Sequence, residues 1–396
     1  MGKPSCLFTQ SVPSVTNTRV GLLLCRSNVF FIVTVSATGV HGLYSRQLVG
    51  GVMLKSFLPV LALIFLLAGC GQSERVVKIS GPTMGTWYHI SWVASDDDSA
   101  ELQQQVDERL AEINRIMSTY DPESELSRIN QSQHWPLNRR VSADLYEVLQ
   151  ISQQIYRQSG GAFDITVGPL VNLWGFGPDG NISQAPEQQQ ITQKLARTGS
   201  DVLSLRQGQL SLAEPRYLDL SAVAKGWAVD DIASLVEAHG YHNFLVEIGG
   251  EIKLGGSKPG GKPWHIAIER PQLAMQAEPQ LIIAPGNRAV ATSGDYRNFF
   301  EDDGVRYSHT IDSRTGRPVR HNLASVTVID ASSARADAWA TALTVAGPEK
   351  GMLLAERQKL AVYMILREED GFSERISSQF KRWFPEAAQQ TNNQHR

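Results

Sequence analysis

The feature that most constrains this chain is an apolar segment that starts at Met53, well inside the sequence. It reads "MLKSFLPVLALIFLLAGC", with one lysine, a short apolar core and small residues before Cys70. A charged start, an apolar core and small residues at a cut site form the layout of a secretory signal. The apolar core is too short for a comfortable transmembrane helix, which needs roughly 20 residues. We therefore expect the folded domain to begin after Cys70.

The end of the segment, "LAGC", resembles the bacterial lipobox, whose cysteine is lipidated and becomes the new N-terminus. Residues 53–69 would then be a lipoprotein signal peptide, Cys70 the lipidation site and residues 70–77 a tether. We expect the protein to face the periplasm, lipid-anchored to the inner or the outer membrane. A buried apolar strand or helix that ends in a chance cysteine is the alternative.

Residues 1–52 do not fit in front of such a signal, which should start near the first residue. They show no clear amphipathic or domain-like pattern. The simplest account is that translation starts at Met53 and that residues 1–52 are a misassigned upstream extension.

The cysteine count weighs against thiol chemistry, and the net charge weighs against nucleic-acid binding. The three cysteines are Cys6, Cys25 and Cys70, and only Cys70 would survive cleavage. The mature protein would then have no disulfide, no thiolate nucleophile and no cysteine metal site. The formal net charge of −3 weighs against general nucleic-acid binding, which depends on neutralising phosphates. Carboxylates, hydroxyls, lysine, histidine and backbone groups must supply the chemistry.

The order of the periodic segments predicts the fold class. "SAELQQQVDERLAEINRIMSTY" and "SADLYEVLQISQQIYRQSGG" have apolar residues at helical spacing, whereas "VVKISGPTMGTWYHISWVA" is typical of strands with a turn at Gly81-Pro82. Helices alternate irregularly with hairpin-like strands, which favours an α+β fold over a regular parallel series. We predict one compact domain over residues 78–385, with a mixed, largely antiparallel sheet and packed helices, and a disordered tail over residues 386–396.

Two glycine-rich stretches resemble nucleotide-binding motifs, but neither meets all the requirements of such a motif. "GFGPDG" fits G-x-G-x-x-G, but a proline lies inside it and no helix pattern follows. "GSKPGGKP" has Pro263 where a P-loop needs Ser or Thr to bind magnesium. Both are interpreted as turns.

Asp337 and Thr341, in "ARADAWATALTVAG", share one face of a predicted helix at positions i and i+4. A carboxylate and a hydroxyl on one face can give two oxygen ligands to a hard cation such as Mg²⁺. Alternatively, Asp337 is a first-turn acid of that helix and Thr341 packs inside.

Two further stretches are candidate ligand positions. In "YLDLSAVAKGWAVDD", Asp219 ends a predicted strand before a helix start, and Lys225 can reach an anion bound there. In "GGAFDITVG", an aromatic precedes Asp164, which suits a heterocycle that needs stacking and a hydrogen-bond acceptor. The alternatives are a capping aspartate with a solvated lysine, and a structural turn.

Taken together, these stretches resemble the FAD:protein FMN transferase family, also called the ApbE family of flavin-transferring lipoproteins. The matching pieces are "GPTMGTWYHISW", "MSTYDPESELSRIN", "GGAFDITVGPLVNLWGFGP", "LDLSAVAKGWAVD", "EIGGEI", "TSGDYRNFF", "SHTIDSRTGRPV" and "ARADAWATALTV". They follow the family's order and cover roughly residues 79–370. The resemblance implies an ApbE-like catalytic domain that attaches the FMN half of FAD to a threonine hydroxyl of a target flavoprotein and releases AMP.

The resemblance also implies roles for individual residues. FAD would be bound by Met84, Tyr120, Ala162, Phe163, Asp164, Asp219 and Lys225. Mg²⁺ would be held by Asp337, Thr341 and the backbone oxygen of Ala222, and His309 in "SHTID" would accept a proton. Acceptors would be subunits of sodium-pumping NADH:quinone reductase or Rnf-type electron-transport complexes. The same site could serve an FAD pyrophosphatase, in which water replaces threonine, or a flavin-binding lipoprotein without chemistry.

Overall fold

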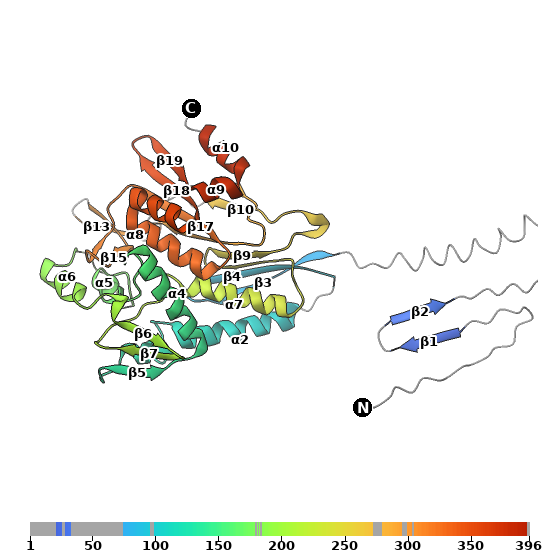
Figure 1. Ribbon diagram of the computed structural model, residues 1–396, viewed down its shortest axis with the longest axis horizontal. Coiled ribbons are helices and arrows are strands. Elements are labelled where there is room, and N and C mark those ends of the chain that lie inside the picture. Colours follow the sequence, from blue (N-terminus) through green and yellow to red (C-terminus); the bar gives the residue numbers. More distant parts are fainter. Residues whose placement is uncertain are drawn as a thin grey trace, which may run out of the picture. The chain divides into compact units, whose positions relative to one another are not determined.

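An eight-stranded sheet organises the chain between Gln72 and Arg396, which forms one compact unit (Figure 1). Every neighbouring pair in it is antiparallel, in the spatial order β19-β18-β17-β12-β9-β8-β4-β3. The strands are β3 (Arg75–Thr83), β4 (Thr86–Ala94), β8 (Phe244–Ile248), β9 (Glu251–Gly255), β12 (Ala289–Gly294), β17 (Leu323–Asp330), β18 (Ala361–Glu368) and β19 (Gly371–Ile376). The predicted α+β fold with a largely antiparallel sheet is confirmed.

The computed structural model describes residues 21–25, 28–32, 74–95, 99–178, 180, 182, 184–271, 279–294, 299–302 and 305–393. Within Met1–Gly71, a separate unit, β1 (Gly21–Cys25) and β2 (Asn28–Ile32) form an antiparallel hairpin. The predicted signal peptide and Cys70 lie outside the described residues. No helix in the described ranges has the length and apolar character needed to span a membrane.

Side chains from the sheet enter two hydrophobic clusters, one on each face. Along β18, Val362 and Met364 belong to the larger cluster, whereas Tyr363 and Ile365 belong to the smaller one. Successive side chains of a strand point to opposite faces, so a strand covered on both sides needs a continuous apolar run. This explains why "LAVYMIL" is apolar throughout.

Helices cover the two faces unequally (Figure 1). The larger cluster includes residues of α2 (Ser99–Met117), α4 (Ala143–Ser159), α7 (Ala224–Ala238) and α8 (Ser333–Gln358), and of α3 (Glu125–Asn130). The smaller cluster joins the other face to α9 (Ser378–Trp383), α10 (Pro385–Asn393) and the hairpin of β10 (Ile266–Glu269) and β11 (Pro279–Ile283).

Small elements surround one end of this framework. They are the three-stranded sheet of β5 (Leu137–Arg140), β6 (Leu203–Arg206) and β7 (Gln209–Leu212), the helices α5 (Gly168–Leu173) and α6 (Gln188–Leu195), and the hairpins of β13 (Phe299–Asp302) with β14 (Val305–Ser308) and of β15 (Ile311–Asp312) with β16 (Arg317–Pro318). A third apolar cluster, built on Leu170, Trp174 and Tyr307, joins α5 to β14. It positions the chain that follows β14.

Four local predictions were wrong. The first hairpin turns at Met84 and Gly85, both at positive φ, while Gly81-Pro82 pair within β3. Because β3 begins at Arg75, the predicted tether to residue 77 ends inside the sheet. "RYLDL" forms no strand, because its backbone amides donate to the Asn130 side chain and to the Ile165 carbonyl oxygen instead of to a neighbouring strand. The predicted disordered tail forms α10 up to Asn393, because Ala387 and Ala388 are buried.

Candidate active site

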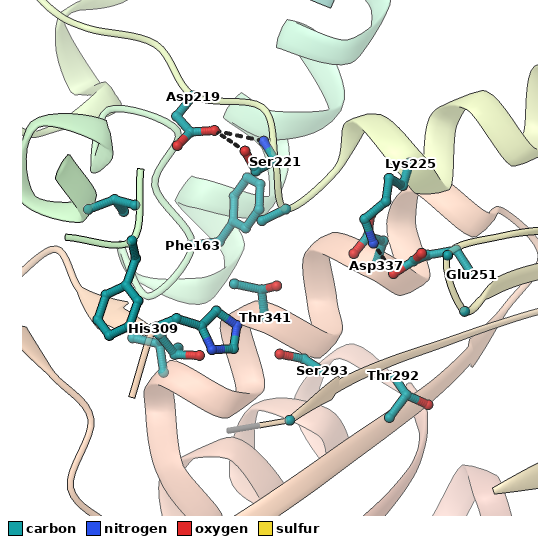
Figure 2. Close-up of a pocket in the computed structure, with 18 of the residues that line it drawn as sticks. Phe163, Asp219, Ser221, Lys225, Glu251, Thr292, Ser293, His309, Asp337 and Thr341 are labelled. Carbon is teal, nitrogen blue, oxygen red and sulfur yellow. Dashed lines mark hydrogen bonds and ion pairs between the residues drawn. The ribbon is translucent and has the colours of Figure 1, made fainter. Parts of the chain in front are cut away.

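A cavity of about 690 Å³ opens between α7, α8, the β8–β9 turn and the end of β12 (Figure 2). This volume lies in the usual range for small-molecule and cofactor sites. The stretches singled out from the sequence meet here. The lining includes Tyr120, Ala162, Phe163, Asp164, Asp219, Ser221, Ala222, Lys225, Glu247, Gly249, Gly250, Glu251, Ser293, His309, Asp337 and Thr341.

Asp337 lies in the second turn of α8, whose N-cap is Ser332, so it is not the first-turn acid of its own helix. Its Oδ2 instead accepts a hydrogen bond from the Gly226 amide, 3.1 Å away. Gly226 is the third residue of α7, and such early amides have no partner within their own helix. Asp337 therefore caps the neighbouring helix α7 from α8, which ties the two helices together at the cavity.

The approach of the two helices depends on a missing side chain. A Cβ atom added at Gly226 would lie 2.4 Å from the Ser333 carbonyl oxygen and 2.8 Å from Asp337 Cβ. Backbone atoms cannot move aside as a flexible side chain can. Glycine is thus required at this position for the Asp337 carboxylate to reach the α7 amide.

The residues predicted to hold a metal ion lie on one wall of the cavity. Thr341 follows Asp337 by one helical turn, and Ala222 lies in the loop immediately before α7. Carboxylate, hydroxyl and carbonyl oxygens are the donors that Mg²⁺ prefers. Burial raises the pKa of Asp337, although Lys225 and the Gly226 amide oppose that rise. A buried carboxylate that resists ionisation gains from a cation, so these residues fit a hard divalent ion.

Lys225 is not the solvated lysine of the alternative interpretation. Its Nζ lies 2.6 Å from Oε1 of Glu251, and the Lys225 side chain is only 28% exposed. Burial lowers the pKa of Lys225, but the charges of Glu251 and Asp337 outweigh burial and raise it overall. The lysine is therefore charged and held on the cavity wall.

Phe163 and Asp164 follow the end of α4, where Gly160 and Gly161 both have positive φ. Asp164 Oδ1 accepts hydrogen bonds from the Thr166 amide, the Thr166 hydroxyl and the Ser200 hydroxyl. Burial raises the pKa of Asp164 despite these bonds. Asp164 thus holds a turn, as the alternative interpretation had it, and the same turn presents the buried Phe163 ring to the cavity.

Asp219 also organises its own loop. Its Oδ1 accepts from the amide and the hydroxyl of Ser221, at 2.9 and 2.5 Å (Figure 2). Its amide donates to the Ile165 carbonyl oxygen at 2.7 Å. This bond joins the Asp219 loop to the segment after Phe163, so the two sequence motifs form one wall.

Of the remaining predicted residues, Tyr120 and His309 line the cavity, whereas Met84 does not. Tyr120 is 70% exposed and lies on the lining, in a loop whose amides bond to Ser118 Oγ. His309 follows β14 and lines the cavity, edge-on to the Phe176 ring with centroids 6.3 Å apart. Met84 is not among the lining residues. It occupies the β3–β4 turn at φ 49° and packs on the larger hydrophobic cluster.

The fold also brings to the cavity residues that no sequence pattern singled out, among them Glu251 and Ser293. Glu251 starts β9, and Ser293 lies near the end of β12. Both come from quoted stretches, "EIGGEI" and "TSGDYRNFF". An acid directly after two glycines was the available signal, because a tight hairpin turn can place the following side chain in a cleft.

Comparison with known proteins agrees with this arrangement. The ApbE family model matches residues 84–364. The FAD:protein FMN transferase of Vibrio cholerae serotype O1 is 46% identical over 334 residues, 83% of this chain and 98% of that protein. The Escherichia coli K12 protein of the same name is 41% identical over 339 residues, 81% of this chain and 95% of that protein.

Solved structures are similar over the same region. The flavin transferase ApbE from Vibrio cholerae has a TM-score of 0.73 at 45% identity, covering 78% of this chain and 99% of that one. The apo Pseudomonas stutzeri flavinyl transferase ApbE has a TM-score of 0.73 at 40% identity, covering 78% of this chain and 97% of that one. With most of its length matched in sequence and structure, this chain belongs to the ApbE family.

Proposed function

We propose that this protein is a Mg²⁺-dependent FAD:protein FMN transferase, which moves FMN from FAD to a threonine hydroxyl of a target flavoprotein. The observation that carries the proposal is the cavity wall where Asp337, Thr341 and Ala222 meet beside Lys225. It offers oxygen ligands for a cation and a fixed positive charge for a phosphate. The relatives named FAD:protein FMN transferase support the same reaction.

The reaction joins the acceptor Oγ to the phosphorus of the FMN half and breaks the pyrophosphate bond to AMP. Phosphoryl transfer needs positioning and charge neutralisation more than a protein nucleophile. When bound, Mg²⁺ neutralises the pyrophosphate and stabilises the leaving oxygen of AMP. Phe163 and Tyr120 offer aromatic surfaces to the rings of FAD, and Lys225 pairs with its phosphates. His309 accepts the proton of the threonine hydroxyl.

We further propose that the chain acts in the bacterial envelope, lipid-anchored through Cys70 and facing the periplasm. Its acceptors would be subunits of sodium-pumping NADH:quinone reductase or Rnf-type complexes. The support is the signal-like segment that ends in "LAGC" and the similarity to relatives named FAD:protein FMN transferase.

The direct test uses the purified protein from Cys70 onward, with FAD, Mg²⁺ and an acceptor subunit. We expect the acceptor to carry flavin that survives denaturation. No flavin should become attached when the acceptor threonine is replaced by valine or when EDTA removes the metal. Gel fluorescence and intact mass measure the product. Release of AMP and free FMN without labelling indicates a pyrophosphatase, and FAD that stays bound and intact indicates a carrier.

A second prediction concerns His309. The His309→Gln variant should transfer FMN about 10²–10⁴ times more slowly, since a positioned general base contributes that much. Its affinity for FAD should stay near that of the unmodified protein. Single-turnover rates and flavin fluorescence separate the two quantities. His89→Gln is the control, because His89 bonds to Glu247 on the surface and should not affect the rate. Full activity of His309→Gln would remove this residue from the mechanism.

A further inference from the structure

Glu251 is a buried carboxylate on the cavity wall, and one of its two oxygens lacks a hydrogen-bond partner among the described residues. Its side chain is 6% exposed, and Oε1 pairs with Lys225 at 2.6 Å. Oε2 is fully buried and has no hydrogen-bond partner among the described residues. An unsatisfied buried charge is costly, so its presence in a native site calls for an explanation such as an absent ion or ligand.

The turn before Glu251 fixes the backbone from which its side chain projects. Gly249 and Gly250 both have positive φ and form the turn between β8 and β9. The Gly249 amide donates to the Trp87 carbonyl oxygen at 3.1 Å, and the Gly250 amide donates to Glu247 Oε1 at 2.6 Å. Because the turn is bound to Trp87 of β4 and to Glu247 of β8, the backbone from which the Glu251 side chain projects is fixed at the cavity wall.

The charges around Glu251 do not balance. Figure 2 shows the Lys225 amine between the carboxylates of Asp337 and Glu251. One lysine therefore faces two buried acids. The arrangement carries one negative charge more than its own residues neutralise when both acids are ionised.

We propose that Glu251 is a further acidic member of the divalent-cation site, which binds the cation together with Asp337, and that Lys225 is the counter-ion holding both carboxylates in the metal-free protein. The cation class is a hard divalent ion such as Mg²⁺ or Mn²⁺, because the donors are oxygens. This inference rests on the proposed function only in placing a cation at Asp337.

The test measures Mg²⁺ binding to the metal-free protein by calorimetry, without FAD and without turnover. Glu251→Gln keeps the shape of the side chain and removes its charge. We expect it to weaken Mg²⁺ binding about 10-fold or more, as changes in groups that support metal ligands do. The control is Glu349→Gln, which removes the same charge from a side chain that is 77% exposed, pairs with Arg375 and lies outside the cavity lining. It should change the affinity less than about 2-fold, because an exposed charge is screened.

A second variant keeps the inference testable if Glu251→Gln folds poorly. In Lys225→Met, two carboxylates face the cavity without their counter-ion. Mg²⁺ should then bind several-fold more tightly, and should raise the melting temperature more than it does in the unmodified protein, because binding only to the folded state stabilises it. Unchanged or weaker Mg²⁺ binding by Lys225→Met contradicts the proposed role of the lysine.

Asp337→Asn distinguishes a failure of the cation site from a failure of the role proposed for Glu251. If Asp337→Asn binds Mg²⁺ as tightly as the unmodified protein, the cation site of the proposed function is wrong. If Asp337→Asn loses binding while Glu251→Gln keeps it, the proposed function stands and the present inference is overturned.

Discussion

Replacing Asp337 by asparagine is expected to reduce Mg²⁺-dependent FMN transfer about 10³-fold while leaving the protein folded. Asparagine can still accept the hydrogen bond from the Gly226 amide, so the tie between α7 and α8 is kept. The lost charge removes a metal ligand, and metal stabilisation of a developing charge is worth several kcal/mol, of which ~4 kcal/mol corresponds to 10³ in rate. Steady-state rates of acceptor labelling at saturating FAD and Mg²⁺ measure the loss.

Stability should respond in the opposite direction. Burial raises the pKa of Asp337, so the ionised form is unfavourable in the folded metal-free protein. A neutral asparagine should therefore leave the free energy of unfolding unchanged or increase it, as is common at functional sites. The control is Asp231→Asn, whose carboxylate pairs with Arg109 at 2.8 Å outside the cavity. It should lower stability modestly and keep the transfer rate. An Asp337→Asn protein that transfers FMN normally would falsify the cation site.

The second large effect is expected from Gly226→Ala, a change of one methyl group. The new Cβ would meet the Ser333 carbonyl oxygen at 2.4 Å, so α7 and α8 must move apart. Overpacking of this kind typically costs 1–3 kcal/mol, and a contact with rigid backbone places the loss at about 3 kcal/mol. Because the same movement separates Asp337 from the Gly226 amide, transfer activity and Mg²⁺ binding should fall with stability. Denaturant unfolding and calorimetry measure the two effects.

Ser234→Ala serves as the comparison for Gly226→Ala. Ser234 lies on the exposed side of the same helix, and its hydroxyl only bonds to the Asp230 carbonyl oxygen one turn earlier. A surface change of this kind should alter stability by no more than about 0.5 kcal/mol. If Gly226→Ala is as mild as Ser234→Ala, close helix approach is not what positions Asp337.

The site residues that the sequence suggested came from local chemistry. Asp337 and Thr341 stand out because a helix repeat puts them on one face, and Phe163 with Asp164 because they follow a double glycine. The role of Asp337 as a cap was anticipated only for its own helix. In the structure it caps α7. The first amides of any helix have no partner within that helix, so they can donate to whichever acceptor the fold brings near.

Glu251 shows why the rest could not be predicted. Lys225 and Glu251 are 26 positions apart, and Asp337 is a further 86 along the chain. Only the pairing of β8 with β9, and the packing of α7 against α8, places the three charges together. Burial then sets their pKa values, and burial is a property of the whole fold rather than of a local pattern.

The sequence by itself determined the α+β class, the helix and strand periods, the oxygen-based chemistry and the family, because each depends on residues close together in the chain or on their order. The tertiary structure decided which carboxylates share a lysine, where Asp337 finds its amide, and that "RYLDL" is held by Asn130 and Ile165 instead of by a sheet. It also ordered residues 385–393 into α10, because the smaller hydrophobic cluster on that face of the sheet offers Ala387 an apolar surface. These outcomes depend on contacts between distant segments, whose energies exist only once the sheet and helices have packed.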